Sequence, residues 1–195
     1  MTLDAPSRRW THEPPAWRAE PRALVVTTAP KTDFWRHTHY GFVRDDGHAW
    51  LEERRGGFLA TVKVTGAYVA QYDQAGLMVR LDAEHWLKCG VEFVDGVQQA
   101  SVVVTRGQSD WSVLPLAGAP STVWFRVARH ADAVAVWYSA DGADFTLLRL
   151  AHLPDRGVAE LGPMCASPDG DGFTARFDEY DVRAAEQPIA LHPPT

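Results

Sequence analysis

The chain has 195 residues, of which 46% are hydrophobic, and a formal net charge of -6. This length is enough for one domain with a sizeable core and short for two. Acidic and basic residues are interspersed, so no basic stripe is available to follow a phosphate backbone, and nucleic acid is not an expected partner. No stretch approaches the roughly 20 apolar residues of a membrane-spanning helix, so no membrane partner is expected.

The N-terminal stretch and the cysteines bear on the compartment. MTLDAPSRRWTHEPPAW has no apolar run after its arginines and does not resemble an export signal. Cys89 and Cys165 show no paired or zinc-binding spacing, so both are expected to be reduced thiols, although a single bridge stays open. The sequence therefore predicts a cytoplasmic protein.

Short β-rich runs recur along the chain between turn signals, and few segments show apolar residues at helical spacing. The clearest run is 58–65, in which Phe58, Ala60, Val62 and Val64 alternate with polar or outward residues. Upstream, ALVVTTAP and TDFWRHTHYGF are expected to supply one or two strands. Further strands are predicted over residues 75–81, 86–94, 100–105, 122–129, 133–139, 145–150 and 173–182.

Short turn-forming links join several of these runs. Asp95-Gly96, Ala131-Asp132 and Asp141-Gly142 suit tight hairpins, since glycine and aspartate readily adopt positive φ. Hairpins in series predict an all-β fold, a two-sheet antiparallel β-sandwich with Greek-key or jelly-roll connections. We expect a single domain over residues 16–184, with loosely held tails at 1–15 and 185–195.

The run HWLKCGVEF predicts a strand with two different faces. Leu87, Cys89, Val91 and Phe93 form an apolar face directed to the core, because alternate side chains of a strand share a face. Trp86, Lys88 and Glu92 lie on the other face. A large indole turned away from the core leaves apolar area that a ligand, a loop or a partner must cover.

Other strands place similar residues on their outward faces. The set predicted to accompany Trp86, Lys88 and Glu92 comprises Tyr72, Gln74, Met78, Arg80, Trp124 and Arg126. Aromatic rings beside cations, amides and a carboxylate are typical of a surface that binds sugars or other polar ligands. The same residues are equally consistent with a sheet face that a loop covers, with Trp86 as a buried anchor and the charges paired across strands.

Two aspartates are further candidates. If its strand runs beside the Trp86 strand, Asp110 is the predicted ion-pair partner of Lys88 at the edge of the pocket. The neighbouring Trp111 is expected to fill the core. Asp73 lies in a polar cluster before Gly76 that can hold a ligand or form one hydrogen-bonded loop. As the only carboxylate there, it is a poor basis for a calcium site.

Catalytic and metal-binding patterns are weak. A retaining glycosidase needs two carboxyl groups roughly 5–5.5 Å apart, and the candidate strand offers only Glu92, with Asp110 or Asp73 as conceivable partners. His37 and His39 alternate on a predicted strand but have no identifiable third ligand. No catalytic residue, metal or cofactor is therefore assigned.

The ordered segments YDQAGLMV, HWLKCGVEF, SVVVTRGQSDWS and ASPDGDGFTARFDEYDV resemble the DUF1349 family, whose members include a regulator of enolase. The resemblance extends from about Asp33 to Val182. It implies the concanavalin A-like lectin/glucanase fold, with a concave sheet whose outward face carries the candidate residues. It implies no reaction, since fold locates a site without defining its chemistry.

Three functions follow as hypotheses. The leading one is a non-catalytic binding protein for a carbohydrate or small polar metabolite, with Tyr72, Gln74, Trp86, Lys88, Glu92, Asp110, Trp124 and Arg126 as ligand-binding residues. The alternatives are a glycosidase-like enzyme that uses Glu92, and a regulatory protein that contacts another protein. The expected assembly is a monomer or a homodimer.

Overall fold

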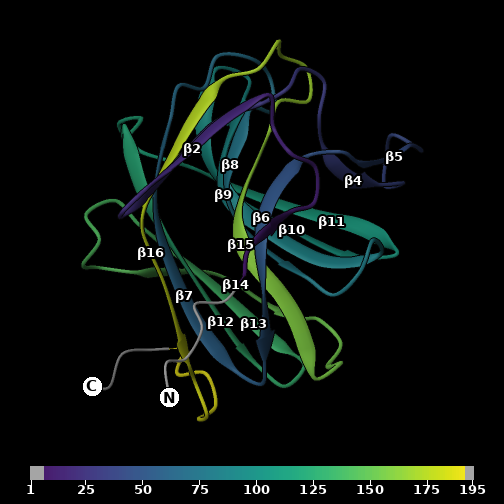
Figure 1. Ribbon diagram of the computed structural model, residues 1–195, viewed down its shortest axis with the longest axis vertical. Helices are drawn as coiled ribbons and strands as arrows, with labels where there is room; N and C mark the ends of the chain where they lie inside the picture. The colour runs from purple at the N-terminus through teal and green to yellow at the C-terminus, as the bar shows by residue number, and fades with distance from the viewer. Residues whose placement is uncertain (1–6, 192–195) are drawn as a thin grey trace.

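The structure, a computed structural model, describes residues 7–191. Within this range the chain forms sixteen strands and no helix, and two antiparallel sheets account for fourteen of the strands (Figure 1). The predicted all-β sandwich is confirmed. Segments 1–6 and 192–195 of the predicted tails lie outside the described residues.

Sheet 1 has seven strands and carries the candidate site. In spatial order it contains β1 (Arg9–Trp10), β6 (His48–Arg55), β15 (Val158–Ala166), β8 (Gln74–Arg80), β9 (His85–Val94), β10 (Val97–Arg106) and β11 (Gln108–Pro115). The β9–β10 hairpin turns at Asp95 and Gly96, whose φ angles of 51° and 78° confirm the predicted turn.

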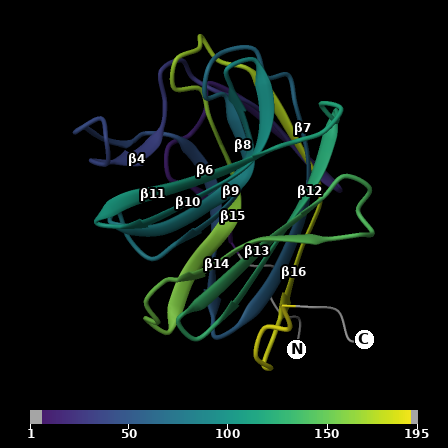
Figure 2. The same cartoon turned by 180° about the vertical axis from the view of Figure 1, so that it is seen from behind.

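Sheet 2 packs against the inner face of sheet 1 (Figure 2). In spatial order it contains β14 (Thr146–His152), β13 (Ala133–Ser139), β12 (Thr122–His130), β7 (Phe58–Gly66), β16 (Thr174–Ala184), β3 (Ala23–Thr27) and β2 (Ala16–Glu20). The strands β4 (Phe34–Arg36) and β5 (Val43–Asp45) form a separate hairpin.

The main core lies between the two sheets and follows the predicted alternation. Phe58, Ala60, Val62 and Val64 of β7 are buried, as are Leu87, Cys89 and Val91 of β9. Both cysteines are buried free thiols, so no bridge joins them. Burial raises the pKa of the Cys89 thiol to about 12.

Several strands were not predicted from the sequence. The strand β6 was missed because it reads HAWLEERR, in which Glu52 and Arg54 interrupt the apolar pattern. Glu52 is nevertheless buried, where it accepts a hydrogen bond from Tyr180 (3.0 Å) and pairs with Arg54 (3.0 Å). The strand β11 is also absent from the predicted strands, as is β15, which contains Pro163, a residue unusual in a central strand.

The described parts of both predicted tails belong to the fold. The strand β1 pairs with β6, which places Arg9 and Trp10 in sheet 1. At the other end, Ile189 and Leu191 pack against Ala128, Ala135 and Trp137 on the outer face of sheet 2. These segments contact the sandwich because their apolar side chains find partners that only the tertiary structure supplies.

None of the residues 7–191 forms a helix long and apolar enough to span a membrane.

Candidate functional site

A pocket of about 260 Å³ lies on the outer face of sheet 1, beside the β4–β5 hairpin. Its floor comes from β8 and β9, and its walls come from the hairpin, from β11 and from the loops before β8 and after β15. The lining residues are Asp33, Trp35, Tyr40, Phe42, Arg44, Tyr72, Gln74, Lys88, Glu92, Trp111, Pro168 and Asp169.

The β4–β5 hairpin covers part of this face and thereby bounds the pocket. Phe34 of the hairpin packs edge-on against Trp86, with ring centroids 6.2 Å apart. Trp86 keeps only 1% of its surface exposed. The sequence left two alternatives open for Trp86, a ligand surface or a buried anchor beneath a loop. The structure shows the second, because the hairpin buries this side chain.

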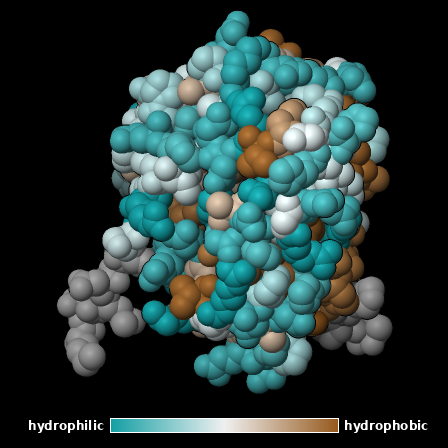
Figure 3. All heavy atoms as spheres, turned by 90° about the vertical axis from the view of Figure 1, so that its right-hand side faces the viewer, coloured by the Kyte–Doolittle hydropathy of each residue, from teal (hydrophilic) through white to brown (hydrophobic). Residues whose placement is uncertain are grey.

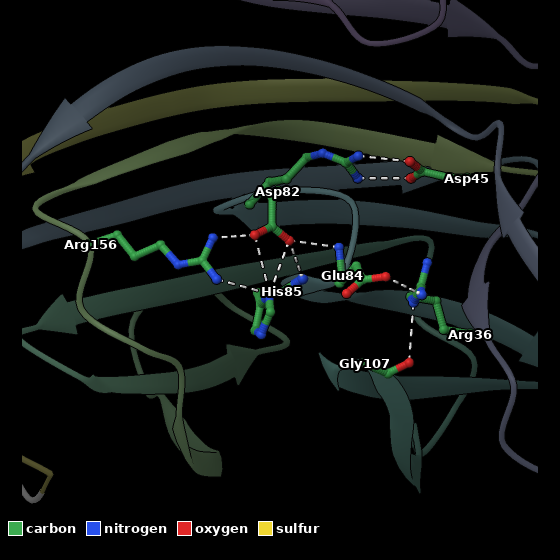
Figure 4. Close-up of polar contacts among 8 residues, drawn as sticks. Arg36, Asp45, Asp82, Glu84, His85, Gly107 and Arg156 are labelled. Atoms are coloured by element: carbon green, nitrogen blue, oxygen red, sulfur yellow. Dashed lines mark hydrogen bonds and ion pairs between the residues drawn. The ribbon is translucent and has the colours of Figure 1, made fainter.

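Ion pairs fix the hairpin to sheet 1 (Figure 4). Arg80 at the end of β8 binds both carboxylate oxygens of Asp45, at 2.8 and 2.7 Å. Arg36 pairs with Glu84 at 2.7 Å and donates to the carbonyl of Gly107 at 3.1 Å. The bidentate geometry of the Arg80 pair adds directional specificity, so the hairpin has a defined position.

Two glycines shape the floor. Gly76 of β8 lies directly opposite Gly90 of β9 on the face that carries Gln74, Lys88 and Glu92. A Cβ atom at either glycine would collide with backbone of the neighbouring strand. The paired glycines therefore allow a close approach of β8 and β9 between the polar side chains that flank them.

Glu92 is a buried carboxylate, 6% exposed, held by two donors on one oxygen. Its Oε2 accepts hydrogen bonds from the Ser101 hydroxyl (2.6 Å) and the Trp111 indole nitrogen (2.9 Å). Its Oε1 accepts no hydrogen bond from the described residues and is the oxygen left to face the pocket. Burial raises the pKa of Glu92, while the charge of Lys88 and the two donors act in the opposite direction.

Lys88 is the buried cation of the floor, 3% exposed. Its ammonium lies 3.3 Å from Oδ1 of Asp33. The same oxygen accepts the backbone N–H of Phe34 at 2.7 Å and the amide of Gln74 at 3.4 Å. Asp33 thus joins the start of the hairpin to two floor residues on β8 and β9.

The walls are largely aromatic. Trp35, Tyr40 and Phe42 come from the hairpin and its loop, Tyr72 from the turn before β8, and Trp111 from β11. The hydroxyls of Tyr40 and Tyr72 are 3.2 Å apart. This hydrogen bond raises the pKa of Tyr40 to about 12, with burial as the second cause.

The structure brings together four of the predicted ligand-binding residues, namely Tyr72, Gln74, Lys88 and Glu92. Met78 and Arg80 share their face, as predicted. Trp86 lies on this face but beneath the hairpin, so it supports the pocket without lining it.

The placement of Trp124 and Arg126 on this face is wrong. Both lie on β12, whose Val123, Phe125 and Val127 point into the core, so the alternate side chains face outward from sheet 2. Trp124 donates to Glu179 at 3.3 Å, and Arg126 lies over the ring of Phe145. The sequence showed which side of each strand is apolar, but not which sheet each strand joins.

The predicted pair between Asp110 and Lys88 is also wrong. Trp111 points toward the pocket, so the adjacent Asp110 points to the opposite side of β11. Asp110 pairs there with Arg149 of sheet 2 at 3.0 Å. The expectation that Trp111 fills the core is wrong for the same reason.

Asp73 also lies away from the pocket. Its Oδ2 accepts the backbone N–H groups of Val69 and Ala70, both at 2.9 Å, and its Oδ1 accepts the hydroxyl of Ser167. These bonds shape the loop before β8. Neither Asp110 nor Asp73 therefore lies beside Glu92 as a second carboxylate.

Sequence reasoning missed the wall that the hairpin supplies. Asp33, Trp35, Tyr40 and Phe42 belong to the aromatic segment TDFWRHTHYGF, for which the sequence predicts only strand structure. Residues 37–42 instead form a loop in which His37 and His39 both have positive φ, so they do not share a strand face. The high density of aromatic residues in this segment was the sequence feature that could have indicated the pocket wall.

Comparison with known proteins agrees with this architecture. The family model described as "Protein of unknown function (DUF1349)" matches residues 10–185. The chain belongs to the DUF1349 family. It is 39% identical over 175 residues to Regulation of enolase protein 1 of Saccharomyces cerevisiae, covering 90% of this chain and 88% of that protein.

Two solved structures show the same sandwich. A functionally unknown protein from S. cerevisiae has a TM-score of 0.88 and 38% identity, with 94% of this chain and 97% of that chain covered. The carbohydrate binding module CBM66 from Bacillus subtilis has a TM-score of 0.58 and 13% identity, with 90% and 95% covered. At this low identity, the second likeness shows the shared jelly-roll fold alone.

Proposed function

We propose that this DUF1349 protein is a non-catalytic binding protein that holds a carbohydrate or another small polar metabolite in the pocket on the outer face of sheet 1. The observation that carries the proposal is the combination of aromatic walls with buried, oriented polar groups on the floor. Oε1 of Glu92 offers an acceptor, and Asp33 holds the ammonium of Lys88 on the same floor. Apolar walls with a few fixed polar groups are typical of small-molecule sites.

The proposal places this binding in the cytoplasm, in a monomer or a homodimer. The free thiols of Cys89 and Cys165 support a reducing compartment.

A thermal-shift screen tests the proposal. The purified protein is titrated with mono- and oligosaccharides and sugar phosphates, because a ligand that binds only the native state raises the Tm by mass action. The site variant is Phe42→Ala, since Phe42 lines the pocket and is 43% exposed, so its loss should affect folding little. The matched control is Leu150→Ala on β14, which is 51% exposed and lies on the other sheet.

The expected result is a saturable increase in Tm that Phe42→Ala abolishes and Leu150→Ala retains. A shift that survives Phe42→Ala places the ligand elsewhere. An unchanged Tm across the whole panel, confirmed by calorimetric titration, contradicts binding of these ligands.

The name of the S. cerevisiae relative favours a second function, regulation through contact with another protein. The exposed rings of Tyr40 and Phe42 give the hairpin loop an apolar tip suited to such contact. Size-exclusion chromatography tests this function. Purified enolase from the organism that encodes this chain is mixed with the chain before the run. Co-elution lost in Phe42→Ala supports regulation by contact, and separate elution contradicts it for that partner.

A further inference from the structure

The pocket walls contain two pairs of mutually perpendicular rings. Trp35 and Tyr40 have centroids 5.7 Å apart at an interplanar angle of 70°, and Tyr72 and Trp111 have centroids 6.3 Å apart at 78°. The bond between the Tyr40 and Tyr72 hydroxyls joins the two pairs. The four rings therefore present faces and edges in different orientations along the pocket wall, and do not form one flat stacking platform.

A second feature is the charge around these rings. The charged lining residues are Arg44, Lys88, Asp33, Glu92 and Asp169. Lys88 pairs with Asp33 at 3.3 Å, and Arg44 pairs with Asp46, which lies outside the lining, at 3.2 Å. Glu92 and Asp169 form no ion pair with any residue from 7 to 191. The pocket lining therefore contains two carboxylates, those of Glu92 and Asp169, that no cation among the described residues pairs with.

The hydrogen-bonding capacity of the site restricts the kind of cationic group that it can hold. A primary ammonium brings three N–H donors that need acceptors when they are buried. Oε2 of Glu92 is occupied by Ser101 and Trp111, and the Tyr40 and Tyr72 hydroxyls bond to each other. Among these oxygens only Oε1 of Glu92 accepts no hydrogen bond from the described residues, and one acceptor is too few for the three donors of a primary ammonium. A methylated ammonium has no such requirement, and ring faces attract it through their quadrupoles.

Building on the proposed function, we infer that the pocket receives a methylated ammonium group of its ligand, enclosed by Trp35, Tyr40, Tyr72 and Trp111, with Glu92 as the counter-charge. The ring faces supply cation–π attraction. Oε1 of Glu92 supplies an uncommitted negative charge at the floor. Lys88 stays paired with Asp33, whose carboxylate offsets its charge.

The test compares choline with 3,3-dimethyl-1-butanol, which replaces the quaternary nitrogen by carbon and keeps the shape. Calorimetric titration is expected to show that choline binds at least about tenfold more tightly, because only the charge differs. Glu92→Gln is expected to weaken choline binding by about tenfold or more, since it removes the counter-charge. Asp110→Asn is the matched control, because it removes a carboxylate from the opposite side of β11.

A second variant tests the inference in case Glu92→Gln does not fold. Phe42→Leu removes a ring stacked on Tyr40 at 5.4 Å while keeping an apolar side chain at an exposed position. It is expected to weaken choline binding while leaving the circular dichroism spectrum and the Tm of the free protein near wild type.

The outcomes separate this inference from the proposed function. Equal affinity for choline and its neutral isostere overturns the inference, as does ethanolamine binding as tightly as choline. If choline fails but a sugar binds in a Phe42-dependent manner, the inference falls and the proposed function stands. If choline and the whole sugar panel fail, both fall.

Discussion

The indole nitrogen of Trp111 on β11 lies 2.9 Å from Oε2 of Glu92 on β9, although β10 runs between the two strands. The hydroxyl of Ser101 on β10 completes the link, since it donates to the same oxygen at 2.6 Å. Three adjacent strands thus converge on one carboxylate, which holds an aromatic wall of the pocket against its floor.

Replacement of Trp111 by Phe should weaken this link. The change removes one donor to a buried carboxylate, so we expect the free energy of unfolding to fall by about 1–3 kcal/mol. Urea denaturation measures this. Trp124→Phe is the matched control, because its indole donates to the exposed Glu179 on sheet 2, and there we expect a loss below about 0.5 kcal/mol. Equal losses in the two variants would show that the hydrogen bond to Glu92 contributes no more to stability than the exposed bond to Glu179.

The pair of Lys88 and Asp33 should behave as a buried ion pair. Asp33→Asn leaves the ammonium of Lys88 buried without its counter-charge, so we expect a loss of about 3 kcal/mol in unfolding free energy. Adding Lys88→Met removes the stranded charge and should restore more than half of that loss. A double-mutant cycle measured by chemical denaturation checks this, and strictly additive effects would contradict it.

The contact between Arg80 and Asp45 should control local opening of the β4–β5 hairpin. Asp45→Asn weakens a bidentate, partly buried pair, so we expect faster amide hydrogen exchange over residues 33–46 with little change in the inter-sheet core. Asp132→Asn, which alters the exposed pair with His152, is the control. Exchange that accelerates evenly across both sheets would instead indicate global destabilisation.

His48 should make stability depend on pH. Its Nε2 accepts the backbone N–H of Ala29 at 3.0 Å, and its Nδ1 lies 2.9 Å from the carbonyl of His12, so the ring is neutral with the proton on Nδ1. Burial lowers the pKa of His48 below its ordinary value of 6.5. The folded state therefore binds fewer protons than the unfolded state, and this contribution to stability is present above pH 6.5 and declines below it.

The difference in Tm between wild type and His48→Gln measures this effect. Glutamine can donate and accept without titrating, so the wild type should lose Tm faster than the variant as pH falls from about 7.5 to about 5.5. Parallel curves would show that protonation of His48 does not contribute.

The sequence determined the strands whose patterns are local. The alternation in β7 and β9 indicated both elements and their buried faces, because side-chain direction in a strand has a period of two residues. The Asp95-Gly96 turn followed from the same local rule. Gln74, Lys88 and Glu92 were placed together correctly because β8 and β9 are adjacent in sequence and pair as a hairpin.

Tertiary structure alone decided how distant strands and loops meet. Trp124 has the same outward alternation as Trp86, yet β12 joins sheet 2, and no local pattern states which sheet a strand enters. The partner of Lys88 is Asp33, 55 residues away, because a hairpin folds back over β9. The strand period thus gives each side chain its face, whereas the pocket arises from long-range packing that brings a separate aromatic segment onto that face.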